Sequence, residues 1–265
     1  MAQQYAMSER HACRLIGLAR STKRYQRRSQ DRDQELRQRL RSLALSRPRF
    51  GYRRLGVLLA REGRKANHKR IYRLYRLEGL MVRRRRRKRL ARGTRIPAVA
   101  PQRCNQRWSM DFVSDSLAGG RTIRALTLVD DYTRECLAIE VDTSLGGMRV
   151  RRVLEDVIAK RGRPEVIVVD NGPEFRGRAV AAWSEERHVR LQFIQPGKPV
   201  QNAFIESFNG RLREECLNAN WFVNLADAKR KIEEWRTDYN EQRPHSSLGY
   251  LPPQQFAQLL FGVPI

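Results

Sequence analysis

The sequence predicts an α/β fold, a mixed β-sheet flanked by helices, preceded by an all-helical region. Two observations predict the sheet. Short apolar runs separated by turn residues begin at Trp108, and after three such runs the strands alternate with amphipathic helices. Three antiparallel strands followed by this alternation are typical of a mixed sheet. A third observation, the confinement of positive charge to the first 100 residues, separates the helical region from the rest.

The helical region begins with two short amphipathic segments. Ser8 is predicted to cap the first helix and Ser21 the second, because serine hydroxyls accept hydrogen bonds from free amides at helix starts. A charged helix follows over residues 31–45, where Leu36, Leu40 and Leu43 recur at helical spacing. It is expected to be a surface helix with one apolar stripe.

Two further short helices, joined by a turn that contains Gly63, are predicted over residues 52–77. Asn67 is placed to cap the second of them. This pattern fits a helix-turn-helix and equally an ordinary αα-hairpin, and the basic surroundings favour DNA binding. The second helix would present four cations to DNA: Lys69, Arg70, Arg73 and Arg76.

The charge distribution indicates a polyanionic partner. Lys and Arg number 54 against 28 Asp and Glu, and residues 1–100 hold 31 basic and only six acidic side chains. A region with this excess of positive charge binds nucleic acid, because it releases the counterions of the phosphates and attracts the polyanion electrostatically. The densest part is a run of seven cations that we expect to follow a phosphate backbone as a flexible linker. It comprises Arg83, Arg84, Arg85, Arg86, Arg87, Lys88 and Arg89.

Other classes of protein fit less well. No stretch reaches the ~18 apolar residues of a membrane span, and no signal-peptide pattern opens the chain. Four scattered cysteines form no zinc-site spacing, so we expect reduced thiols and a cytoplasmic location. They are Cys13, Cys104, Cys136 and Cys216.

From Trp108 on, the elements alternate in a fixed order. Gly119 and Gly120 are expected to form a hairpin turn between the first two strands. Near the end, Trp235 and Tyr239 are spaced to pack one helix face, and the Pro-rich terminus is expected to run extended. Strands are predicted over residues 107–113, 122–130, 135–142, 165–169 and 189–194, and helices over 148–160, 178–187, 202–217 and 225–240.

Three carboxylates interrupt this pattern. Asp111 lies inside an apolar strand, Asp170 ends another, and Glu206 lies opposite the apolar stripe of its helix. Singly, each has an ordinary explanation: a satisfied core residue, a turn cap and a solvated helix residue. Jointly, they can converge on two magnesium ions roughly 3.5 to 4 Å apart, which clamp the oxygens of a displacement at phosphorus. Four other acids rank below them: Asp115, Asp130, Asp131 and Glu174.

The motifs WSMDFV, VVDNGPEF, PGKPVQNAFIESFNGRLREECLN and YNEQRPHSSLGYLPP resemble the second-frame transposase of the bacterial insertion-sequence-three family. The resemblance covers nearly the whole chain, and Asp170 and Glu206 are separated by 35 residues, the interval of that family. The family belongs to the DDE transposase and retroviral-type integrase superfamily. The resemblance therefore implies a ribonuclease H-like catalytic fold and assigns Asp111, Asp170 and Glu206 as catalytic metal ligands.

The resemblance also implies the reaction and its partners. The enzyme would nick transposon-end DNA to expose a 3′-hydroxyl, which attacks target DNA without a covalent protein–DNA intermediate. Two Mg²⁺ ions are expected, with Mn²⁺ able to substitute. A homo-oligomer on double-stranded DNA is implied, with a fusion to an upstream-frame protein and a nucleoid-associated location as further expectations. Residues expected to hold substrate phosphates are Lys198, Asn202 and Arg213.

Two alternatives stay open. One is a ribonuclease H-like nuclease or resolvase that cuts without strand transfer, and the other is a DNA-binding regulator without catalysis. The expected organisation is a helical DNA-binding region over residues 1–82, a basic linker over 83–106, a catalytic domain over 107–222 and a C-terminal helix with a Pro-rich extension over 223–265.

Overall fold

The structure is a computed structural model that describes residues 7–25, 29–82, 100–195 and 202–261. The chain forms two compact units, Met1–Val82 and Arg83–Ile265. The first is helical and the second holds the sheet, as the sequence predicts. No described helix is long and apolar enough to cross a bilayer.

The first unit contains five helices among its described residues. They are α1 (Glu9–Leu15), α2 (Arg20–Lys23), α3 (Ser29–Ser46), α4 (Tyr52–Arg61) and α5 (His68–Leu77). The last three pack around a shared apolar core, in which Leu40 of the predicted stripe and Leu55 and Leu59 of α4 are fully buried. Asn67 caps α5 as predicted, since its Oδ1 accepts the Lys69 amide at 2.9 Å.

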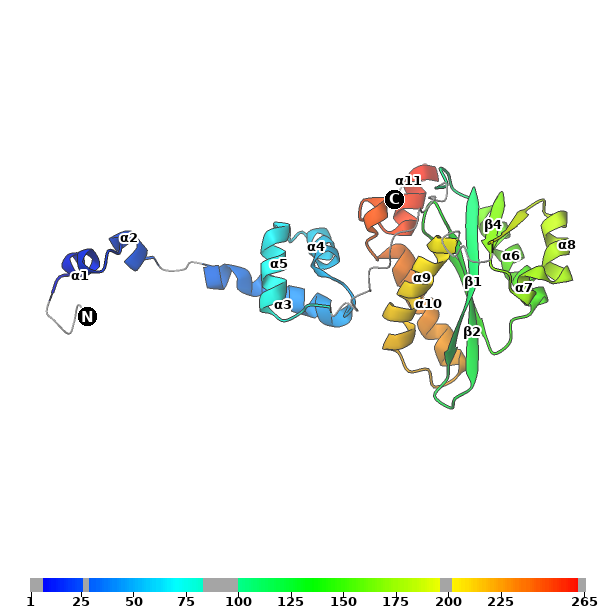
Figure 1. Cartoon of the computed structure of the whole chain (residues 1–265), viewed down its shortest axis with the longest axis horizontal. Coiled ribbons are helices and arrows are strands. Elements are labelled where there is room, and N and C mark those ends of the chain that lie inside the picture. Colours follow the sequence, from blue (N-terminus) through cyan, green and yellow to red (C-terminus); the bar gives the residue numbers. More distant parts are fainter. Residues whose placement is uncertain (1–6, 26–28, 83–99, 196–201, 262–265) are drawn as a thin grey trace. The chain divides into compact units, whose positions relative to one another are not determined.

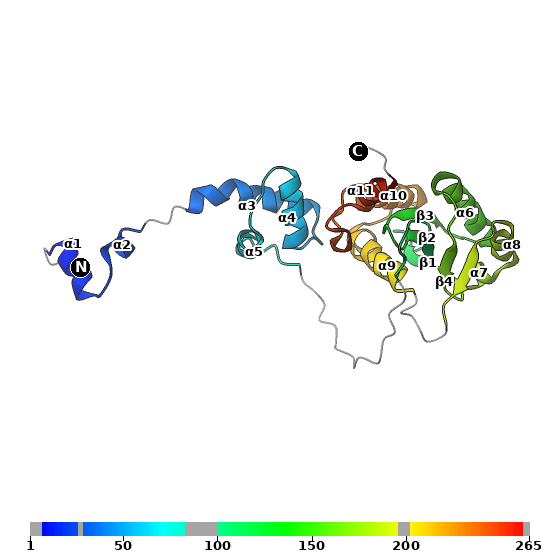
Figure 2. The same ribbon diagram turned by 90° about the horizontal axis from the view of Figure 1, so that it is seen from above.

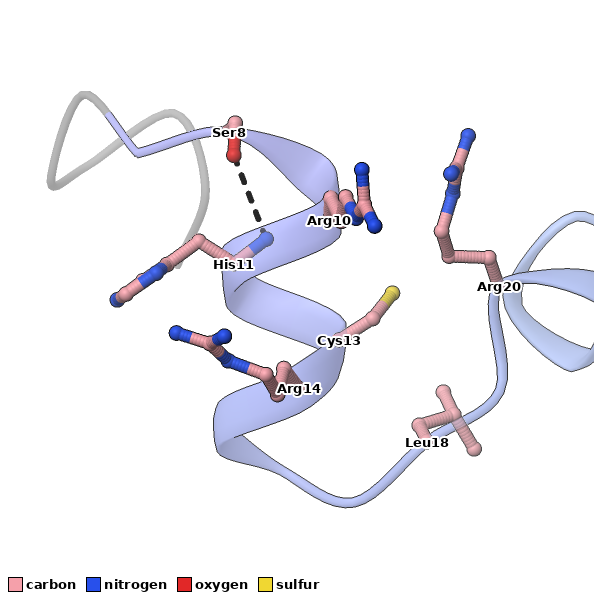
Figure 3. Close-up of a pocket in the computed structure, with 7 residues that line it drawn as sticks. All are labelled: Ser8, Arg10, His11, Cys13, Arg14, Leu18 and Arg20. Atoms are coloured by element: carbon pink, nitrogen blue, oxygen red, sulfur yellow. Dashed lines mark hydrogen bonds between the residues drawn. The ribbon is translucent and has the colours of Figure 1, made fainter.

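The start of α1 follows the prediction, whereas that of α2 does not. Ser8 accepts the His11 amide at 3.3 Å (Figure 3). Helix α2 begins one residue before Ser21, with Ala19 at its N-cap, so the predicted Ser21 cap is wrong. A hollow between α1 and α2 is lined by Cys13 together with Arg10, Arg14 and Arg20, which Figure 3 labels.

The second unit is built on a five-stranded sheet in the order β3-β2-β1-β4-β5. The strands are β1 (Arg107–Ser116), β2 (Thr122–Asp130), β3 (Cys136–Asp142), β4 (Val166–Val169) and β5 (Arg190–Phe193). β1, β2 and β3 pair antiparallel, and β4 runs parallel to both β1 and β5. The mixed sheet is therefore confirmed. Gly120 has φ +80° in the predicted hairpin turn, a conformation that glycine adopts without strain.

Helices cover both faces of this sheet (Figure 1). On one face lie α6 (Gly147–Arg161), α7 (Pro173–Arg176) and α8 (Arg178–Glu186), which share a core with Trp108 and Ile167. On the other lie α9 (Ala203–Glu215) and α10 (Leu225–Glu241), which share a core with Val113 and Val129. Figure 2 shows the sheet between these two layers. Alternate residues of β1 therefore serve opposite cores, as strand geometry requires.

The C-terminal segment differs from the prediction. Residues Pro253–Phe261 form helix α11 rather than an extended tail. Proline suits the first turn of a helix, because its missing N–H would have no intrahelical partner there. Short 3₁₀ helices precede it at Leu217–Ala219 and Ser246–Leu248. As predicted, Trp235 and Tyr239 lie on one face of α10, and both rings contact Phe208 of α9.

The motif YNEQRPHSSLGYLPP has a structural role in this unit. The Asn240 amide exchanges two hydrogen bonds with the backbone of Cys136, each 2.9 Å, as a neighbouring strand would. Arg243 is buried and forms an ion pair with Glu215 at the end of α9. These contacts fasten the end of α10 to β3 and the segment after it to α9. All four cysteines are free thiols, as expected.

Candidate active site

Asp111 lies in the middle of β1, the central strand, opposite Thr127 of β2. Its Oδ2 accepts a hydrogen bond from Nδ2 of Asn209 in α9 at 2.8 Å. The buried Thr127 hydroxyl lies 2.9 Å from Oδ1 of Asn209 and 3.1 Å from the Asp111 carbonyl oxygen. Because that hydroxyl donates to the Asn209 oxygen, the amide is turned so that its NH₂ faces the carboxylate. Sequence reasoning missed this positioning pair, because local sequence signals do not carry the register that brings Thr127 and Asn209 to Asp111.

Asp170 follows the last residue of β4, where the buried strand opens into a turn. Its Oδ1 accepts the Gly172 amide at 2.8 Å, which closes an Asx-type turn. Pro173 then begins α7. The sequence Asn171-Gly172-Pro173 thus directs the chain away from the sheet and holds the Asp170 carboxylate at its edge.

Glu206 lies in the first turn of α9 and is exposed. The opposite side of the helix carries Ile205, Phe208 and Leu212 into the core, as the predicted stripe requires. Burial of that stripe fixes the rotation of α9. Glu206 and Asn209 are consequently held on the side that contacts Asp111.

The three carboxylates are close enough to influence one another. Burial raises the pKa of Asp111 to about 6, and the negative charges of Asp170 and Glu206 add to the increase. Among the described residues none of the three makes an ion pair, in a chain with a net charge of +26. Uncompensated carboxylates around a half-buried aspartate are an environment that stabilises a bound cation.

Magnesium fits this donor set. Within the described part of the chain, no group of three or more His, Cys, Asp or Glu side chains is placed so that it could hold a metal ion by itself. Mg²⁺ does not need one, since it keeps several waters and binds through one or two carboxylates together with substrate phosphates. The open arrangement of Asp111, Asp170 and Glu206 agrees with that preference.

The competing acids are occupied by structural contacts. Asp130 accepts the amides of Asn105, Tyr132 and Thr133 and is fully buried. The other three also have partners: Asp131 binds Arg107 and Ser109, Glu174 pairs with Arg124, and Asp115 accepts the Ser116 amide. Their contacts agree with ranking them below the three carboxylates.

The cations of α5 fall into two pairs. Arg70 and Arg73 both bind the buried Asp33 of α3, at 2.5 and 2.7 Å. Lys69 and Arg76 are exposed and make no ion pair among the described residues. Asp33 therefore connects α3 to α5 and neutralises part of the surface predicted for DNA, a role that sequence reasoning missed.

Near α9, Arg213 is exposed, and its Nη2 donates to the Ser114 carbonyl oxygen at 3.1 Å. Asn202, which was expected to hold a substrate phosphate, is instead buried at the start of the helix. Other predicted contacts lie outside the described residues: Lys198, Arg83, Arg84, Arg85, Arg86 and Arg87.

Gly172 holds the Asp170 carboxylate by leaving space for it. A Cβ at this position would lie 2.9 Å from Oδ1 of Asp170 and 3.2 Å from Oε2 of Glu174. Gly172→Ala should therefore displace the carboxylate and reduce DNA nicking by about a hundredfold, since a misplacement of about 1 Å can cost that much. The measurement is the rate of magnesium-dependent nicking, together with the thermal midpoint of unfolding.

Gly146→Ala is the matched control. Gly146 also occupies a helix N-cap with an extended backbone, and a Cβ added there would have no atom within 4 Å. The backbone of Gly172, at φ −60° and ψ 146°, is likewise accessible to alanine. Both substitutions should change stability by only about 1 kcal/mol. Equal nicking rates in the two variants would show that Gly172 does not position Asp170.

Comparisons with known proteins agree with this arrangement. The chain matches the Integrase core domain over residues 101–199 and 187–253, and the HTH-like domain over residues 30–88. It is 51% identical to the 31.7 kDa protein of insertion element IS407 of Burkholderia multivorans, over 95% of this chain and 91% of that protein. It is 48% identical to the 39.2 kDa protein of insertion element IS476 of Xanthomonas euvesicatoria, over 97% of this chain and 74% of that protein.

The fold also resembles a solved structure, the simian T-cell lymphotropic virus intasome in complex with a PP2A regulatory subunit. The TM-score is 0.52 at 16% sequence identity, and the match covers 76% of this chain and 70% of that one. The five-stranded mixed sheet is thus an integrase-type, ribonuclease H-like core, and the first unit carries a DNA-binding HTH-like domain. The chain belongs to the insertion-sequence-three family of insertion-element transposases, polynucleotidyl transferases of the DDE transposase and integrase superfamily.

Proposed function

We propose that this transposase nicks the ends of its element in a magnesium-dependent reaction and joins the exposed 3′-hydroxyls to target DNA. The observation that carries the proposal is the position of Asp111, half-buried in the central strand within reach of the charges of Asp170 and Glu206. Three carboxylates without a described counter-cation are suited to phosphoryl transfer.

The roles of the residues follow from their surroundings. Asp111, Asp170 and Glu206 would hold the metal. Bound Mg²⁺ supplies Lewis-acid stabilisation of the scissile phosphate and activation of water or a 3′-hydroxyl. Asn209 keeps the Asp111 carboxylate oriented, and the turn at Gly172 does the same for Asp170. Arg213, which is exposed on α9 beyond Asn209, would bind a substrate phosphate.

DNA recognition is proposed to reside in α5 of the HTH-like domain. Lys69 and Arg76 would contact DNA directly, while Arg70 and Arg73 are positioned by Asp33. Joining two element ends in one reaction requires two bound ends, so we infer that the chain works as a homo-oligomer on DNA. Fusion with an upstream-frame protein stays a prediction of the resemblance.

A joining assay tests this function against the nuclease alternative. The substrates are DNA carrying an end of the element that encodes the chain and a separately labelled target. The expected result in Mg²⁺ is a product that contains both labels. Nicked end DNA without joined product would instead support a nuclease or resolvase, and neither product would support a regulator without catalysis.

The run of seven cations from Arg83 to Arg89 provides a prediction about DNA affinity. Replacing Arg83–Arg89 with alanine should weaken DNA binding and flatten the dependence of log K on log[salt], by about 0.9 for each phosphate that these cations neutralise. Binding is measured on end DNA over a range of salt concentrations. An unchanged slope would show that these cations do not contact DNA.

A further inference from the structure

The side of α9 that faces away from the carboxylates lines a second pocket of about 280 Å³. Its walls come from α9, α10, the turn after β2 and the segment after α10. Ser207 and Arg211 of this pocket lie about 100° and 140° around the helix from Glu206, at 100° per residue. The pocket therefore adjoins the proposed catalytic site without sharing its side chains.

Two guanidinium groups line this pocket, Arg134 and Arg211. Among the described residues neither makes an ion pair. Arg134 lies over the Phe204 ring, 4.1 Å from its centroid, and Arg211 Nη1 donates to the Ser207 carbonyl oxygen at 2.9 Å. These contacts orient the two cations without neutralising them.

The electrostatic surroundings of both groups are those of a site that lacks its anion. Burial lowers the pKa of Arg134, and the neighbouring charge of Arg211 lowers it further. Burial also lowers the pKa of Arg211. The nearby acids offset only part of this lowering of the two pKa values. Asp131 is already bound to Arg107 at 2.6 Å, and Glu215 is bound to Arg243 at 2.6 Å.

The backbone of Arg134 gives an independent observation. Its φ is +64°, in the left-handed region that favours glycine. An arginine at such a position is conformationally costly, so its side chain must contribute something that glycine cannot. Backbone strain of this kind accumulates at functional sites.

We propose that Arg134 and Arg211 together bind one phosphodiester group of the DNA backbone. Guanidinium groups present forked donors that match phosphate oxygens, and Ser207 and Tyr239, which carry hydroxyl groups, are also among the residues that line the pocket. Burial raises the pKa of Tyr239 to about 12, so its hydroxyl stays protonated and can donate.

The proposal rests on the transposase function, but its test does not require catalysis. The full-length chain is titrated with a fluorescent duplex carrying one end of its element, with divalent metal chelated and salt varied. Arg134→Gly and Arg211→Gln should each weaken binding about tenfold and flatten the slope of log K against log[salt] by about one. In the double variant the slope should also decrease by only about one, because both guanidinium groups hold the same phosphate.

Two controls separate binding from stability. Arg152→Gln removes an exposed cation on α6 and should leave the slope unchanged. Arg134→Gly should keep or raise the thermal midpoint of unfolding, because glycine relieves the positive φ. A lower midpoint in this variant would mean that Arg134 serves packing over Phe204 and would overturn the proposal.

Three other results would also overturn it. The first is an unchanged slope of log K against log[salt] in both single variants, and the second is a decrease of that slope by about two in the double variant. The third is unchanged DNA affinity together with an altered oligomeric state, which would indicate that a carboxylate of a second copy occupies the pocket. Failure of the transposase function is read separately, from nicking by Asp170→Asn in Mg²⁺. That variant should retain the full salt slope in the chelated assay.

Discussion

Replacing Asp170 with asparagine should reduce nicking of end DNA about a thousandfold while leaving DNA binding and folding intact. Asparagine retains the Oδ1 that accepts the Gly172 amide, so the turn after β4 should persist. It removes the negative charge that would bind magnesium. Loss of a metal ligand costs several kcal/mol of transition-state stabilisation, and each ~1.36 kcal/mol is a factor of ten in rate. The measurement is single-turnover nicking of labelled end DNA in Mg²⁺.

Asp115→Asn is the matched control for this experiment. Asp115 lies on β1, four residues after Asp111, and its Oδ1 accepts only the neighbouring Ser116 amide among the described contacts. Its substitution removes the same charge from the same sheet and should leave nicking near the wild-type rate. Wild-type nicking by Asp170→Asn would remove Asp170 from the mechanism, and equal losses in both variants would indicate a general charge effect.

The sequence was sufficient to predict the sheet because its signals are local. Alternation and turn residues place the strands, and apolar spacing orients α9 so that Glu206 faces away from the core. The positions of Asp111 and Asp170 follow from where apolar strands are interrupted or end. What these signals do not carry is the register of distant segments, which decides that Thr127 and Asn209 meet Asp111.

The structure also differs from the sequence-based predictions at the C-terminal segment, at Asn202 and at Asp33. The predicted extended C-terminus treated Pro253 as a breaker, although proline at the first helical position is compatible with α11. Asn202 was expected to hold a substrate phosphate, but it precedes α9, and tertiary packing buries it. The interhelical ion pairs of Asp33 depend on how α3 and α5 pack, which periodicity alone does not determine.

The second large effect concerns Arg243, whose side chain is 1% exposed. Its Nε and Nη2 donate to the two oxygens of Glu215 at 2.8 and 2.6 Å, and its guanidinium lies 5.5 Å from the Tyr239 ring centroid. Arg243→Met should lower the free energy of unfolding by about 3 to 5 kcal/mol, because it leaves a largely buried carboxylate without this guanidinium. For a unit of this size the midpoint should fall by about 10 °C, as measured by calorimetry.

A double substitution distinguishes the ion pair from packing. Arg243→Met combined with Glu215→Met should recover most of the lost stability, since replacing both partners of a buried pair by apolar groups is often neutral. Arg230→Met is the control: the exposed Arg230 pairs with Asp227 and Glu234 on the surface of α10, so its loss should cost no more than about 1 kcal/mol. Absence of recovery would assign the effect to packing of Arg243 against Tyr239. Either way, a loss of this size would establish that the motif after α10 stabilises the end of α9, the helix that carries Glu206.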